Sequence, residues 1–144
     1  MPASRKIAPN PTDPAAPFER STRQRRNIRA VFESADRPLS IDEVLSAAKR
    51  GRHKVSLSTV YRFVRSLVDE GSLEVIEMPG LGAFYEVAGK AHHHHFSCLA
   101  CGRVYELNDC VSIRELALPK GFKAVSHDIT VAGACAACSA SASP

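Results

Sequence analysis

Four cysteines in two C-x-x-C pairs have the most specific chemistry in this sequence. The pairs are Cys98/Cys101 and Cys135/Cys138. Two intervening residues let both sulfurs of a pair reach one ion, and four thiolates suit a closed tetrahedral zinc site. Because 33 residues separate the pairs, more than in a short zinc finger, we expect one structural Zn²⁺ ion that holds a small domain together. Buried thiols or an occasional disulfide are the alternatives.

Four consecutive histidines, His92, His93, His94 and His95, precede the first pair. A zinc site with four thiolates has no position left for them, so they indicate a second metal with a different role. At strand spacing His93 and His95 share one face and His92 and His94 the other, so two sites could be served from opposite faces. A solvated loop is one alternative, and a purification tag is another, although tags are normally terminal and longer.

Composition and charge divide the chain into two unlike parts. It has 144 residues, of which 44% are apolar, which suits one or two small domains. Residues 1–65 hold 14 Lys/Arg and 6 Asp/Glu, whereas residues 66–144 hold 5 and 9. A basic part followed by an acidic part rich in His and Cys indicates a nucleic-acid-binding region and a sensing or assembly region.

The expected compartment is the cytoplasm, without membrane association. No apolar run reaches membrane-spanning length, and residues 1–17 lack the apolar core of a signal peptide. In the cytoplasm, paired cysteines bind metal more often than they form disulfides. The fifth cysteine, Cys110, is interpreted as a buried small hydrophobe.

Apolar residues at helical spacing predict three helices in the basic part. The first begins at Ser21. Ser40 and Glu43 form a capping-box pattern before the second, and Ser56 or Ser58 caps the third. These caps and apolar stripes are typical of short amphipathic helices that pack on one another.

A β-hairpin follows the third helix, with strands expected at 73–77 and 83–87 around a Pro-Gly turn. Three helices and a hairpin are the order of a winged helix-turn-helix domain. Residues 89–91 are a candidate hinge. Beyond it we expect a short helix at 109–116 and strands at 95–99, 103–107 and 122–131. The expected divisions are a disordered tail (1–18), two domains (19–88 and 89–138) and a second tail (139–144).

Polar and basic side chains lie on the exposed face of the third predicted helix. Because its apolar stripe faces inward, we expect four residues to lie off that stripe, on the exposed side: Ser58, Tyr61, Arg62 and Arg65. Arginine can bond a guanine edge through two hydrogen bonds, and tyrosine can pack on a thymine methyl or bond a phosphate. The alternative is a solvated basic face. A second basic cluster, suited to phosphates or the minor groove, precedes or opens the first helix: Arg20, Arg23, Arg25 and Arg26.

Five segments occur in an order that resembles the ferric uptake regulator family, which includes iron, zinc and peroxide sensors. They are TRQR at 22–25, STVYR at 58–62, FYE at 84–86, HHHHFSCLACG at 92–102 and GACAAC at 133–138. The resemblance covers most of the chain. It implies an α+β fold, in which a winged helix-turn-helix DNA-binding domain precedes a small α/β dimerisation domain that carries the four-cysteine zinc site.

The resemblance also implies residue roles in a homodimeric, metal-dependent repressor of palindromic operator DNA. Tyr61 and Arg62 would read bases, and Arg20 matches a basic minor-groove residue. Ligands of a regulatory metal site at the domain junction are matched by Glu86, His93, His95 and Glu106. Positions of a further site in the dimerisation domain are matched by His92, His94 and His127.

Several positions depart from the family pattern. Iron sensors usually place a histidine where this chain has Pro38, and zinc sensors draw a ligand from near Glu74, which is otherwise an ordinary exposed strand carboxylate. The further site usually has a carboxylate at Ile113, so that site is weakened or absent. His127 alternates with apolar residues, so a satisfied core histidine is its alternative role. Glu106 stands where peroxide sensors have aspartate, which disfavours peroxide sensing.

We therefore expect a transcriptional repressor similar to zinc uptake regulators, with Zn²⁺ or Fe²⁺ as the regulatory metal. An iron(II)-sensing regulator is the main alternative. A metalloenzyme is a third hypothesis, because an open His/Glu site can activate water, but no nucleophile motif accompanies it. A zinc-storage or chaperone protein is a fourth. Neither of the last two explains the Tyr61/Arg62/Arg65 face.

Overall fold

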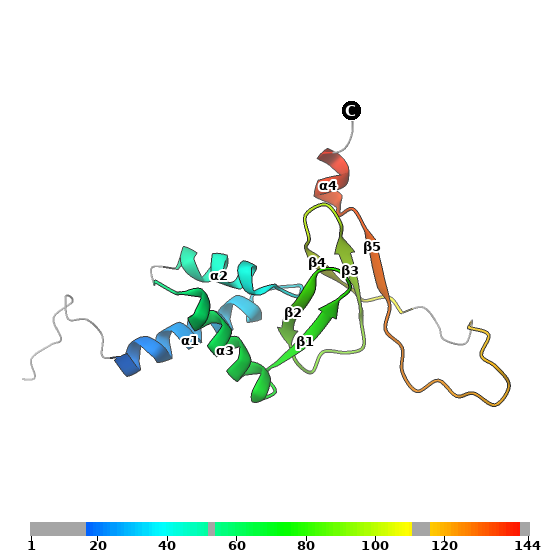
Figure 1. Ribbon diagram of the computed structural model, residues 1–144, viewed down its shortest axis with the longest axis horizontal. Helices are drawn as coiled ribbons and strands as arrows, with labels where there is room; N and C mark the ends of the chain where they lie inside the picture. The colour runs from blue at the N-terminus through cyan, green and yellow to red at the C-terminus, as the bar shows by residue number, and fades with distance from the viewer. Residues whose placement is uncertain (1–16, 52–53, 111–115, 142–144) are drawn as a thin grey trace, which may run out of the picture.

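The computed structural model describes residues 17–51, 54–110 and 116–141, in two neighbouring groups of elements. Figure 1 shows a group of helices followed by a hairpin, and beside them a second sheet with a short terminal helix. The elements are α1 (Pro17–Glu33), α2 (Ile41–Arg50), α3 (Leu57–Asp69), β1 (Leu73–Met78), β2 (Gly82–Val87), β3 (His94–Cys98), β4 (Val104–Leu107), β5 (Thr130–Gly133) and α4 (Ala136–Ser141). None of the helices in these ranges is long and apolar enough to cross a membrane.

Local hydrogen bonds start the second and third helices where the sequence predicts. Glu43 N–H donates to Ser40 Oγ at 3.3 Å, and Ser40 N–H donates to the Glu43 carboxylate at 3.0 Å. This reciprocal pair confirms the capping box. At α3 the cap is Ser56, whose Oγ accepts from Thr59 N–H at 3.3 Å. Ser58 instead lies inside the first turn.

The helices pack around an apolar core that continues into the hairpin. Ile28, Val44, Val60 and Leu67 are completely buried at its centre. Helix α1 starts at Pro17, earlier than the predicted Ser21, so it includes the last two residues of the tail expected at 1–18. Residues 1–16 of that tail lie outside the described residues. The apolar faces of three short helices therefore stabilise one another, which none could do alone in water.

The hairpin joins the helices to the second sheet. Leu39, which precedes α2, forms a two-way backbone bridge with Tyr85 of β2 at 2.9 Å. A second small apolar cluster combines Met78 and Phe84 of the hairpin with Val104 of β4. The hairpin therefore contacts both the helices and the second sheet.

The second sheet has the strand order β4-β3-β5. Strand β3 pairs antiparallel with β4, with His95 opposite Glu106, and parallel with β5, with His95 opposite Thr130. Parallel neighbours need a long connection, and residues 116–129 of the connection between β4 and β5 extend away from the sheet (yellow to orange in Figure 1).

The sequence predicts a helix and a strand in this connection, and the described residues test mainly the strand. The strand predicted at 122–131 is wrong over most of its length, because β5 begins only at Thr130. Its alternating pattern has no sheet to pack on among the described residues, and Val125 is 97% exposed. The helix predicted at 109–116 falls mainly on residues 111–115, outside the described residues. The described ends of that range are not helical.

Candidate functional site

The two cysteine pairs lie at one end of the second sheet, with their four sulfurs within 4.8 Å of one another. Cys98 ends β3 and Cys101 follows in a tight turn, in which Gly102 adopts φ 70° and donates to the Cys98 carbonyl at 2.9 Å. Cys135 and Cys138 stand at the start of α4. The spacing observed in the sequence therefore becomes a compact four-sulfur cluster that could hold zinc, here called the cysteine cluster.

Backbone groups favour deprotonated sulfur in the cysteine cluster. Hydrogen bonds from the backbone of Cys135, whose N–H is 3.3 Å from the sulfur, and of Cys101 lower the pKa of the Cys98 thiol to about 6. The Cys138 backbone lowers the pKa of the Cys135 thiol, and bonding to Cys135 raises the pKa of Cys138 to about 12. Metal ligation requires thiolates, which the lowered pKa values favour at Cys98 and Cys135, whereas Cys138 would have to lose its proton to the ion. Four converging sulfurs nevertheless fit a structural zinc ion.

A second cluster, here called the hinge cluster, contains Glu86 of β2 with His93 and His95 from the other side of residues 89–91. Glu86 is only 3% exposed. Its Oε1 lies 2.9 Å from His93 Nε2 and 3.4 Å from His95 Nε2. His93 Nδ1 donates to the Ala91 carbonyl at 2.8 Å, so a neutral ring turns a lone pair towards the carboxylate. A cation between the two groups would resolve that conflict.

His95 adds a further sign that the hinge cluster suits a metal. Its Nε2 is buried without a directed hydrogen bond among the described residues. Burial lowers the pKa of His95 more than the nearby Glu86 carboxylate raises it. A neutral imidazole with an unsatisfied buried nitrogen is an available ligand for zinc or iron(II).

Two other predicted ligands lie beside the hinge cluster rather than in it. Glu106 faces His95 in the strand register, but its carboxylate is bound by the ammonium group of Lys90. Glu74 faces Glu86 across the hairpin, is exposed, and accepts from Gly89 N–H at 3.4 Å. Both carboxylates therefore lie on strands next to the cluster, and the structure does not bring them into it.

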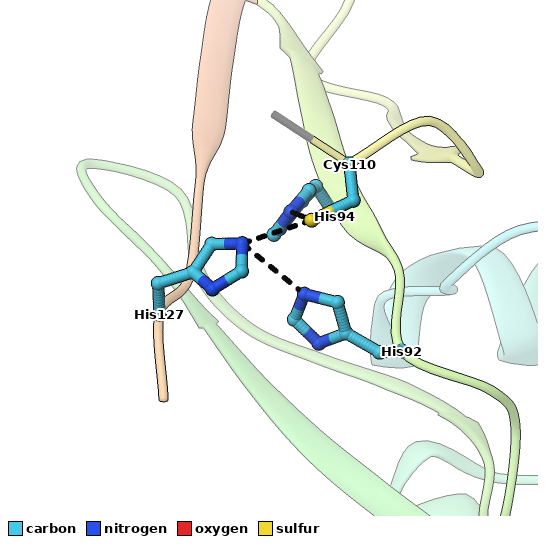
Figure 2. A group of neighbouring side chains, drawn as sticks. All are labelled: His92, His94, Cys110 and His127. Carbon is cyan, nitrogen blue, oxygen red and sulfur yellow. Dashed lines mark hydrogen bonds between the residues drawn. The ribbon is translucent and has the colours of Figure 1, made fainter. Parts of the chain in front are cut away.

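A third cluster gathers His92, His94 and His127, the residues expected to form the further site, together with Cys110 (Figure 2). Cys110 is exposed, so its interpretation as a buried hydrophobe is wrong. His127 is half-buried and contacts polar partners rather than an apolar core. Cys110, a thiol three residues beyond β4, could have been noticed in the sequence as a potential metal ligand. Its partners His94 and His127 are distant in the sequence, so the cluster could not be assembled from it. This group is called the histidine–cysteine cluster.

The predicted DNA-facing residues are exposed on the helical half. Tyr61 is 54% exposed, and with Arg62 and Arg65 it lines a groove between α3 and the hairpin of about 640 Å³. Ser58 and Arg20 are exposed as well. Arg25 is different, because it donates to Ser66 Oγ at 2.8 Å and pairs with Glu70. Arg25 therefore fastens α1 to α3 and is not part of the basic face.

Comparison with known proteins agrees with this geometry. The model of the ferric uptake regulator family matches residues 19–132. The zinc uptake regulation protein of Mycobacterium tuberculosis is 33% identical over 122 residues, covering 83% of this chain and 94% of its own. The chain belongs to the ferric uptake regulator family.

Two further comparisons are with the ferric uptake regulator of Helicobacter pylori. Its ferric uptake regulation protein is 30% identical over 122 residues, covering 83% of this chain and 81% of its own. A solved structure of the ferric uptake regulator from this organism superposes with a TM-score of 0.60 at 28% identity, covering 84% of this chain and 83% of that one. That structure reveals three functional metal-binding sites in the Helicobacter pylori protein.

Membership of the ferric uptake regulator family confirms the expectation of a metal-responsive transcription regulator rather than an enzyme. It also confirms the expected fold class, helices plus sheets with a four-cysteine cluster. One departure from the family pattern has a structural counterpart. Pro38, where iron sensors usually have histidine, is completely buried and offers no ligand atom.

Proposed function

We propose that this protein is a repressor that binds palindromic operator DNA as a homodimer when Zn²⁺ occupies the hinge cluster. The observation that carries the proposal is the position of the ligands. Glu86 precedes residues 89–91, and His93 and His95 follow them. An ion held by all three would restrain the connection between the DNA-facing half and the second sheet. Relatives named for zinc and for iron regulation support the metal dependence.

The regulatory ion would be held by Glu86, His93 and His95; Glu106, with Glu74 as an extra ligand, would complete the set after moving in from the neighbouring strands. The strand register supports these additions, because Glu106 lies opposite His95 and Glu74 opposite Glu86. The bound ion supplies positive charge between a buried carboxylate and two imidazoles. It favours DNA binding only to the extent that these ligands converge better in the DNA-binding arrangement than in others.

Zinc is the favoured signal, and iron(II) is the alternative. The ligand types alone suit both ions. The buried Pro38 lacks the imidazole that iron sensors usually have, which favours zinc. A second, structural Zn²⁺ is assigned to the cysteine cluster on the convergence of its four sulfurs. The paired thiols also support a cytoplasmic location, where such pairs bind metal.

We assign DNA reading to the exposed face of α3. Tyr61, Arg62 and Arg65 line the groove beside the hairpin, and Ser58 opens the same helix. Arg20 on α1 would contact the minor groove or a phosphate. In this proposal residues 19–88 form the DNA-binding domain and residues 89–138 the metal-binding dimerisation domain.

Exposed apolar side chains support the proposal of a homodimer. Around the connection between β4 and β5, large apolar side chains are exposed: Leu116, Leu118, Phe122, Val125 and Val131. Several large exposed apolar side chains in one stretch of sequence are typical of association surfaces. A second copy would supply a covering surface of matching character by symmetry.

The test uses the full-length chain and a duplex enriched from random sequence by the zinc-loaded protein. The variant His93→Ala/His95→Ala should lose the zinc-stimulated part of binding, measured by fluorescence anisotropy, while keeping one tightly bound zinc. Glu77→Gln, which removes an exposed carboxylate of β1 outside the hinge cluster, is the matched control. This variant should respond to zinc like the parent. An unchanged zinc response in the double variant would exclude the hinge cluster as the sensor. Anaerobic titration with Fe²⁺ separates zinc from iron sensing.

A further inference from the structure

The histidine–cysteine cluster brings four donor atoms from three separate segments to one point. Cys110 Sγ lies 3.0 Å from His127 Nε2 and 3.4 Å from His94 Nε2. His92 Nε2 lies 3.4 Å from His127 Nε2. The four ligand atoms are within 4.8 Å of one another. Figure 2 shows the side chains pointing towards a shared centre.

Hydrogen bonding among these groups cannot satisfy all of them. His127 Nε2 faces both His92 Nε2 and Cys110 Sγ. A neutral ring nitrogen carries either one proton or one lone pair, so it meets only one of those two needs. Three imidazole rings are also crowded, with centroids 4.6 to 4.9 Å apart. Donors that converge without being satisfied by one another are what a metal ion requires.

We propose that Cys110 supplies the fourth ligand, a thiolate, to the further site that the family resemblance expects at His92, His94 and His127, and that this sulfur makes the site selective for Zn²⁺-like ions. Three nitrogen donors and one sulfur donor match the tetrahedral preference of zinc. A thiolate ligand disfavours hard cations such as Mg²⁺ and Mn²⁺, which prefer oxygen. The sulfur therefore replaces the carboxylate that the family pattern would have placed at Ile113, and it changes which metals the site accepts.

The four ligands should contribute unequally. Ile129 N–H donates to His94 Nδ1 at 3.2 Å, so the neutral ring carries its proton on Nε2, the atom that faces the sulfur. Metal-bound imidazoles normally donate from their other nitrogen. His94 therefore has to give up its bond to Ile129 in order to bind through Nε2. We expect loss of His94 to weaken metal binding less than loss of Cys110 or His127.

This site is separate from the hinge cluster and does not depend on the proposed function. His92 and His94 come from the start of β3 and the residues just before it, Cys110 from the segment after β4, and His127 from the segment before β5. A bound ion would fasten the two ends of the long β4–β5 connection to β3. Removal of Cys110 leaves the hinge ligands and both cysteine pairs unchanged, so the sites can be tested independently.

The test is a Co²⁺ titration of full-length protein that already holds one zinc. Parent protein should show a thiolate-to-cobalt charge-transfer band and tetrahedral ligand-field absorption, and Zn²⁺ but not Mg²⁺ should displace the cobalt. Cys110→Ser should lose that band, and its affinity for the added ion should fall by about 100-fold or more, since even outer-shell partners are worth 10–100-fold. His94→Ala should lose less, and His93→Ala/His95→Ala should keep the band.

A second measurement needs no variant. Alkylation of Cys110 in the parent protein, located by peptide mass, should be slowed by Zn²⁺ added in excess of what the cysteine cluster and the hinge cluster can hold, and not by Mg²⁺. The proposal is overturned if Cys110→Ser binds the added ion with parental affinity and spectrum. It is equally overturned if added zinc leaves the alkylation rate of Cys110 unchanged.

Discussion

The ammonium group of Lys90 lies 3.1 Å from the buried Glu86 carboxylate, which is the carboxylate of the hinge cluster. Lys90 also binds Glu106, so it bridges β2 and β4. Gly89, at φ 80°, turns the chain so that the lysine can reach both groups. A side-chain cation therefore neutralises the charges to which a regulatory metal would bind, and the metal has to displace it.

Lys90→Met should increase the affinity of the hinge cluster for Zn²⁺ by about 10-fold, because an ion-pair contact worth about 1 kcal/mol no longer competes. The same change should destabilise the metal-free protein, since the buried Glu86 carboxylate loses the ammonium group that pairs with it. Competition against a chromophoric chelator measures the first effect and urea unfolding the second. Lys90→Arg, which keeps the charge, is the control. Equal zinc affinity in Lys90→Met and parent would contradict this role for Lys90.

Cys98→Ser should release the zinc of the cysteine cluster and unfold the second sheet. The four sulfurs are the contacts that join the turn after β3 to α4, and structural zinc sites contribute their binding free energy directly to folding. Metal analysis and circular dichroism of the purified variant check both effects. A Cys98→Ser protein that kept its full zinc content and its dimer would show that this cluster has another role.

Arg62→Ala and Tyr61→Ala should each weaken specific DNA binding by roughly 1–3 kcal/mol without lowering the thermal stability of the domain. Both side chains are exposed, so their loss leaves the core intact. Arg50→Ala, on α2, is the matched exposed-arginine control. Arg20→Ala should instead weaken binding to all sequences similarly and reduce the salt dependence. Normal operator binding by both α3 variants would mean that another face docks on DNA.

The pair Arg37–Glu43 should make stability depend on acid pH. Burial raises the pKa of Glu43, but bonds from Arg37 and Ser40 outweigh it and lower the pKa below its usual 4.5. A lowered folded-state pKa gives stability that is present above the unfolded pKa and is lost as the pH falls through the folded one. Arg37→Ala should therefore cost about 1 kcal/mol at pH 7 and much less below about pH 4. Urea unfolding at both pH values tests this, with Arg23→Ala, at an exposed arginine, as the control. A cost that did not depend on pH would contradict it.

The sequence predicted most accurately the features that depend on interactions between residues close together in the chain. The Ser40/Glu43 capping box needs only neighbouring residues, and the hairpin needs only its turn and two apolar strands. The convergence of Cys98 with Cys135 could be predicted for a similar reason, because two C-x-x-C pairs have few other uses in such a chain.

Features that depend on distant partners were not predictable. The alternation of Val125 and Ile129 suggested a strand, but pairing requires a neighbouring strand that no local pattern encodes. Cys110 could not be matched to His127 without knowing how the β4–β5 connection runs. The role of Lys90 between Glu86 and Glu106 likewise follows from two strands that approach only in the folded molecule.

The exposed course of the connection between β4 and β5 makes occupancy of the histidine–cysteine cluster subject to mass action. His127 and β5 follow directly from this stretch, in which Phe122 is 68% exposed. If a second copy covers these side chains, association will fix the position of His127 and raise the affinity of the cluster for its metal. By linkage, the bound metal will then raise the affinity of the two copies for each other by the same factor. The metal affinity of this chain should then rise with its own abundance, so that a scarce regulator and a plentiful one respond to different metal concentrations.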